Sequence, residues 1–161
     1  MRTRVDTTEL VAAMRHVEQQ LEVTMPQALA LIGDRIVNEA KRTTLFTDRT
    51  TNLRRSILRG PITGSFGEGK LEIDVMAGGL GGVTYARAVH DGSRAHDIRP
   101  KRRRSLRFVG ASGGFVFRRV VHHPGTAARP FMTQAIEANV PFAERTFGNV
   151  IKLSFARAGF A

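Results

Sequence analysis

The chain contains no cysteine and no tryptophan, and it has one tyrosine against ten phenylalanines. The absence of cysteine excludes disulfides, thiolate metal sites and cysteine nucleophiles. No apolar run approaches the roughly 18 residues that a membrane-spanning helix requires. The N-terminal residues carry charge but no apolar segment, which argues against a signal peptide. We therefore expect an intracellular soluble protein that does not interact with membranes.

Acidic residues are missing from residues 98–136, a stretch that holds nine basic residues. Residues 1–97 are almost neutral, with 13 Lys and Arg against 12 Asp and Glu, whereas residues 98–161 have 12 against 2. Nearly all of the net charge of +11 therefore lies in the C-terminal part of the chain. Like charges gathered on one surface repel one another unless an anion or an acidic partner is nearby. This charge distribution indicates a surface that binds nucleic acid or acidic protein.

The length of 161 residues fits one domain, because domains commonly contain about 100–200 residues. Apolar residues at helical spacing predict two helices, over residues 7–22 and 25–43, or one long helix kinked at Pro26. Asp6 is the expected cap of the first helix. We expect a helical part over residues 1–43, a sheet over residues 53–122 and a C-terminal helical part over residues 127–158, within a single domain.

The sheet is predicted from apolar alternation and from turn residues. Residues 53–62 have short β character, and residues 71–77 alternate as a half-buried strand before a Gly-rich turn at residues 78–82. Residues 105–109 and 115–122 predict a hairpin with a Gly-rich loop at residues 110–114. The last helix is expected to break or kink at Pro141. The predicted class is α+β, with N-terminal helices, a central antiparallel sheet with a basic hairpin, and a C-terminal helix.

Several short motifs occur in a fixed order along the chain. They are TNLRRSI at residues 51–57, YARAVHDGS at 85–93, IRPK at 98–101, LRF at 106–108, VFRRVVHHPGT at 116–126 and RPFM at 129–132. In order and spacing they resemble the tail-component, or neck, family of long-tailed bacteriophages, over roughly residues 43–138. The sequence departs from that family at His90, where an acidic residue is common, and at Thr51 and Asn52, where a glycine often precedes the leucine. The motif residues that the resemblance marks as structural are Tyr85, Gly92, His123, Pro124, Gly125, Thr126, Pro130 and Phe131.

The resemblance implies a non-enzymatic virion protein at the head–tail junction, made in the cytoplasm of the host bacterium. Members of the family join the portal region of the capsid to the tail or complete the end of the tail. By this resemblance the chain forms a ring around the DNA channel, for which a hexamer is favoured and a dodecamer is the alternative. The ring contacts adjoining connector or tail proteins, and no cofactor, catalytic residue or metal site is expected.

The His-Pro-Gly-Thr element is interpreted as a folded corner. Pro124 fixes its own φ and Gly125 accepts a positive φ, so the pair suits a type II turn. Pro130 suits the first turn of a helix, and Phe131 is then expected to enter the core. The motif therefore predicts a strand-to-helix corner.

The basic residues of this region are the predicted site of contact with a partner or with DNA. A solvated surface is the simplest interpretation, and contact with DNA phosphates or with acidic faces of neighbouring subunits are the functional ones. Phe108, Phe115 and Phe117 lie nearby and fit a strand whose apolar face packs on a core, in preference to a platform on which bases stack. The predicted contact residues are Arg99, Lys101, Arg102, Arg103, Arg104, Arg107, Arg118 and Arg119.

Two other classes of function stay open. The same basic residues fit a free-standing nucleic-acid-binding domain, and the His and Asp residues fit a hydrolase or nuclease. Ser93, His90 and Asp91 supply the residue types of a catalytic triad, but no nucleophile-elbow motif surrounds them. His122 and His123 point to opposite faces of a strand, which disfavours joint binding of one metal ion.

Overall fold

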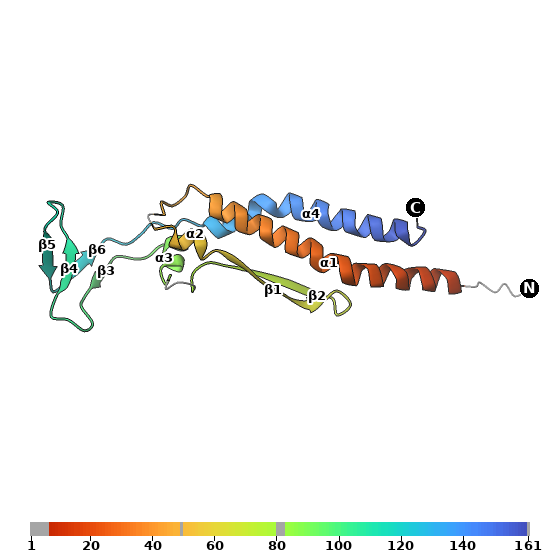
Figure 1. Ribbon diagram of the computed structural model, residues 1–161, viewed down its shortest axis with the longest axis horizontal. Helices are drawn as coiled ribbons and strands as arrows, with labels where there is room; N and C mark the ends of the chain where they lie inside the picture. The colour runs from red at the N-terminus through yellow and green to blue at the C-terminus, as the bar shows by residue number, and fades with distance from the viewer. Residues whose placement is uncertain (1–6, 49, 80–82, 161) are drawn as a thin grey trace, which may run out of the picture.

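The computed structural model describes residues 7–48, 50–79 and 83–160 of the chain. They form an elongated molecule in which the helices α1 (Thr8–Arg42) and α4 (Phe131–Arg157) pack along each other (Figure 1). The strands β1 (Leu58–Ser65) and β2 (Lys70–Met76) form an antiparallel ribbon on the other side of α1. The combination of helices with small antiparallel sheets confirms the predicted α+β class.

The remaining elements are short. Two helices, α2 (Asn52–Arg55) and α3 (Ala86–His90), lie near the end of α1, and four strands form a separate group at the far end of the molecule (Figure 1). These strands are β3 (His96–Ile98), β4 (Leu106–Val109), β5 (Phe115–Arg118) and β6 (Val121–His123).

The prediction of one central sheet over residues 53–122 is wrong. The described strands pair as three separate two-stranded sheets, β1–β2, β3–β6 and β4–β5, all antiparallel. The ribbon covers α1, whereas the other two pairs lie beyond the helical body (Figure 1). Within the described residues no hydrogen-bond ladder joins the three pairs into one sheet.

Pro26 lies inside α1, which runs as one helix of 35 residues, so the two-helix prediction is wrong and the single-helix alternative holds. Pro141 likewise does not end α4. A proline in a helix interior removes one backbone hydrogen bond and costs about 3 kcal/mol or more. Buried residues on both sides of each proline offset this cost, among them Leu21 and Ala28 in α1 and Ala135 and Ser154 in α4.

Two predicted features fall partly outside the described residues. The expected helix cap at Asp6 lies outside them, and so do residues 80–82 of the predicted Gly-rich turn. The start of that turn is described, and Gly78 and Gly79 have φ angles of 91° and 81°.

The segment predicted as a strand from residue 53 begins instead as α2, and only its later part forms β1. Thr51 precedes α2 with a φ of 61°. The guanidinium of Arg54 donates hydrogen bonds to the carbonyl oxygens of Lys41 and, at 2.8 Å, of Thr43. The last carbonyl groups of a helix have no partner within the helix. Arg54 therefore donates hydrogen bonds to carbonyl groups that lack partners at the end of α1. These bonds hold α2 beside the end of α1 before the chain enters β1.

The core lies where α1 ends beside α2, α3 and the start of α4. Phe131 is 1% exposed, and its ring meets the ring of Phe46 edge to face at 5.0 Å between centroids. Further along the helix pair, Arg35 Nε donates to Oδ1 of the buried Asn139 at 2.9 Å and joins α1 to α4. The buried core residues are Val37, Ala40, Phe46, Leu53, Ile57, Val83, Ala86, Phe131 and Ala135.

Replacing Phe131 with alanine is expected to destabilise the protein by about 3–5 kcal/mol, because it leaves a cavity between α1, α3 and α4. Urea unfolding followed by circular dichroism measures the change. Leu153→Ala is the control, since this side chain of α4 is 57% exposed and its loss should change stability by less than about 0.5 kcal/mol. Equal effects of the two changes would contradict the assigned core.

Candidate functional site

Two neighbouring chain segments cross between the helical body and the strands at the far end. The backbones of Ser93 and Thr126 exchange two hydrogen bonds, each 2.9 Å long. Gly92 and Gly125 flank this crossing with φ angles of 79° and 94°. A Cβ on Gly125 would lie 2.4 Å from the Ser93 carbonyl oxygen, and one on Gly92 would lie 2.7 Å from the Thr126 oxygen. The crossing therefore requires glycine at both positions.

The other motif residues that the resemblance marks as structural lie before or after this crossing along the chain. Gly125 has the positive φ that the predicted Pro-Gly turn needs. Its N–H donates a hydrogen bond to Nδ1 of His123 at 3.1 Å, which holds the turn in place. Tyr85 precedes α3, and Pro130 precedes α4 as its N-terminal flanking residue. Phe131 follows Pro130 into the core. The predicted strand-to-helix corner is therefore confirmed.

Beyond the crossing, residues 93–126 form what we call the strand module. In β3–β6, His96 pairs with His123 and their rings stack at 5.1 Å, whereas His122 pairs with Asp97 and lies 3.1 Å from its carboxylate. The two adjacent histidines thus have different partners on opposite faces. Among the described residues no group of three or more His, Asp or Glu side chains is placed to hold a metal ion.

The β4–β5 hairpin forms the outer part of the strand module. Its predicted loop is present, with the Gly110 N–H donating to the Gly114 oxygen at 2.8 Å. Arg107 pairs with Phe117, and Val109 pairs with Phe115, so the four side chains share one face of the two-stranded sheet. We call this surface, formed by Arg107, Val109, Phe115 and Phe117, the hairpin face.

The aromatic residues of the hairpin do not pack on a core, which corrects the sequence interpretation. Phe115 and Phe117 are 62% and 56% exposed, and Phe108 on the other face is 41% exposed. The guanidinium of Arg107 lies 4.4 Å from the centre of the Phe115 ring. Periodicity identified the β4–β5 hairpin, but the single strand predicted over residues 115–122 is wrong, because β5 ends at Arg118 and β6 begins at Val121 in another sheet. Periodicity also cannot tell whether another layer covers a strand. An exposed apolar face that carries arginine is typical of an interaction surface.

All eight predicted contact residues lie in the strand module and are exposed. Residues 101–104 form an irregular loop between β3 and β4, and in the part of the chain described no carboxylate lies within ion-pair distance of them. Arg99 lies 3.9 Å from Asp97. Arg118 Nη1 donates to the Phe117 carbonyl oxygen, and Arg119 is exposed between β5 and β6. The structure thus brings the eight cations together around one protruding module.

The triad residues considered from the sequence do not assemble. Ser93 is held by its backbone at the crossing, whereas His90 Nδ1 donates to Asp91 Oδ1 at 2.6 Å. His90 Nε2 faces the Thr133 hydroxyl at 3.3 Å, a contact that sequence spacing did not reveal because the two residues are 43 positions apart. The hydrogen bond from His90 lowers the pKa of Asp91 below its ordinary value, and Arg87 adds to this effect.

The arrangement around His90 fits a structural role. His90 Nδ1 is held by the Asp91 carboxylate, and its Nε2 contacts the Thr133 hydroxyl of α4 at 3.3 Å. The His90 ring also meets the Phe131 ring edge to face at 5.4 Å. His90 therefore connects α3 to the first turn of α4 through both a polar contact and an aromatic contact.

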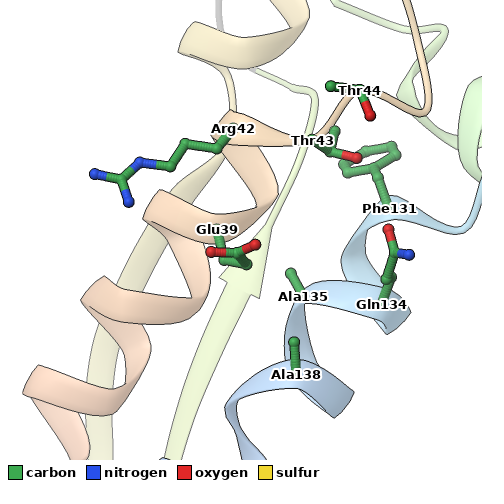
Figure 2. A pocket seen from close by; sticks show the side chains of 8 residues that line it. All are labelled: Glu39, Arg42, Thr43, Thr44, Phe131, Gln134, Ala135 and Ala138. Carbon is green, nitrogen blue, oxygen red and sulfur yellow. The ribbon is translucent and has the colours of Figure 1, made fainter.

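A pocket of about 280 Å³ opens where α1 ends beside the start of α4 (Figure 2). Ala135 and Ala138 of α4 face Glu39 across it, whereas Arg42 points away from the other side chains. The pocket combines the carboxylate of Glu39 with the hydroxyl groups of two threonines and the amide of Gln134. These converging groups are too few for a recognisable catalytic site. The lining residues are Glu39, Arg42, Thr43, Thr44, Phe131, Gln134, Ala135 and Ala138.

Comparisons with protein-family models, curated proteins and solved structures found no match to this chain. Among the described helices, none is both long enough and apolar enough to cross a membrane.

Gly125→Ala is expected to lower the melting temperature. The positive φ alone costs roughly 1–3 kcal/mol for a residue other than glycine, and the overlap with the Ser93 carbonyl adds to it. Thermal unfolding measures the change. Gly114→Ala is the control, because its φ is not positive and nothing lies within 4 Å of the added methyl group. If both variants melt like the parent protein, the crossing does not depend on glycine.

Replacing Arg102, Arg103 and Arg104 together with serine is expected to leave the free energy of unfolding within about 0.5 kcal/mol of the parent value, because exposed side chains without ion-pair partners contribute little. Denaturant unfolding checks this. A large loss of stability would show that these side chains are buried and paired.

Proposed function

We propose that this chain is a non-enzymatic structural protein of a bacteriophage virion, acting at the head–tail junction as a head–tail connector or tail completion protein. It assembles as a ring, with a hexamer favoured over a dodecamer, and it joins head to tail around the DNA channel. Adjoining connector or tail proteins are its partners in the virion. The host cytoplasm is the place of synthesis.

The observation that carries this proposal is the protruding strand module. It holds the eight clustered cations and an exposed apolar hairpin face, outside a helical body that has its own core. A lone two-stranded hairpin is marginally stable in water, so a partner that covers the strand module would stabilise it. A subunit of an assembly has such a partner.

The motif resemblance adds support of a different kind. Gly92, Gly125 and Thr126 form the crossing at which the module leaves the body, and Phe131 anchors the helix that follows. The motif residues thus determine where the charged module stands relative to the core. In a ring subunit this placement would decide how far the module reaches toward the next subunit or the DNA.

A free-standing nucleic-acid-binding domain is the second candidate. The observation that favours it is the exposed loop over residues 101–104, whose cations have no carboxylate nearby among the described residues. Such cations neutralise phosphates and release counterions without reading sequence. A third candidate, a hydrolase or nuclease, draws only on the histidine contacts described above.

Native mass spectrometry and a salt titration of DNA binding separate these candidates. We expect discrete homo-oligomeric rings, hexamers first, together with weak binding to duplex DNA. A protein that stays monomeric at all concentrations and binds duplex DNA with a steep salt dependence would favour the second candidate. A metal-dependent nuclease activity that is lost on His123→Ala would overturn both non-enzymatic candidates.

A further inference from the structure

A second exposed apolar surface lies at the other end of the molecule from the hairpin face. It is a groove lined by the first half of α1, the turn that joins β1 to β2, and the last turns of α4. Figure 1 shows these three segments at the end of the molecule opposite the strand module. We call it the helix–ribbon groove; its volume is about 610 Å³. Its main apolar lining residues are Leu10, Met14, Leu21, Phe66 and Phe155.

Leu10 and Met14 are about half exposed, at 52% and 46%, although Val17 and Leu21, further along the same helix, are buried at 3% and 6% exposure. Apolar side chains that surround a hollow lose more water on docking than side chains scattered singly over a surface. The groove is large enough to receive aromatic side chains. It therefore has the shape and the chemistry to accept an apolar projection.

The hairpin face is such a projection, but it cannot reach the groove of its own chain. The face lies at one end of the elongated molecule and the groove at the other, with α1 between them (Figure 1). With 35 residues, α1 alone spans roughly 50 Å at the usual rise of a helix. Only another copy can bring the two surfaces together.

The charges around the two surfaces are complementary. The strand module has nine basic residues and one acidic residue over residues 93–126. Residues 8–23 of α1 carry three carboxylates, Glu9, Glu18 and Glu22, against one guanidinium, Arg15. Glu18 and Arg15 both line the groove, so Glu18 is the carboxylate at its rim and Arg15 the cation. Opposite potentials favour the contact between module and groove and disfavour the contact of two modules.

We propose that the hairpin face of one subunit docks into the helix–ribbon groove of the next copy. Phe115 and Phe117 enter the apolar hollow, and Arg107 approaches Glu18 at its rim. The two surfaces differ, so the contact is head-to-tail, and it closes into a ring when the rotation per subunit divides a full turn. This inference rests on the proposed ring and names the surfaces that build it.

The absence of cysteine makes a direct test straightforward, because only introduced thiols react. Val109→Cys places one thiol on the hairpin face, and Met14→Cys places another in the groove. The two proteins are mixed and treated with a short bis-maleimide, and products are separated on a denaturing gel. Leu31→Cys is the matched control for the groove, since it lies on the same helix, is 55% exposed and lies outside the groove.

We expect a cross-linked dimer from Val109→Cys with Met14→Cys, and loss of that product when Leu31→Cys replaces Met14→Cys. Arg107→Glu should reduce the yield, and Glu18→Lys in the partner should restore part of it. Rings in native mass spectrometry without this cross-link would overturn the inference and leave the proposed ring standing. Absence of both rings and cross-link would overturn both proposals. Efficient linkage of Val109→Cys to itself would mean that hairpins meet each other, which also overturns the inference.

Discussion

The burial of Phe131 is the interaction on which the rest of the structure depends. Its ring meets Phe46 after α1 on one side and His90 at the end of α3 on the other, and it is the first residue of α4. One side chain thus connects three helices that are distant in sequence. Burying an aromatic ring of this size contributes about 1.5–3 kcal/mol to the apolar free energy of folding.

The helical body built around Phe131 determines where the strand module is attached. The chain leaves α3 and returns before α4 through the crossing of Ser93 and Thr126, where added Cβ atoms would collide with backbone. This crossing holds the two segments together at the base of the strand module. The cations and the aromatic residues are consequently presented on a structured projection, which suits a surface that recognises a partner.

The two exposed apolar surfaces have a common physical explanation. The molecule is long, so a single body cannot cover both of its ends, and each end exposes side chains that a compact domain would bury. In the proposed head-to-tail contact, opposite charge would favour the meeting of unlike ends, and repulsion between the basic modules would disfavour the meeting of like ends.

Local patterns in the sequence were enough to predict the α+β class, the position of β2, the β4–β5 hairpin and the corner at Gly125, because turn chemistry and apolar spacing act over a few residues. Tertiary structure alone decided that α1 continues through Pro26, since packing against α4 and the ribbon outweighs a local preference. It also decided that Phe115 and Phe117 face solvent and that His90 meets Thr133. Burial and long-range contact depend on which surfaces meet in space, and no local pattern contains that information.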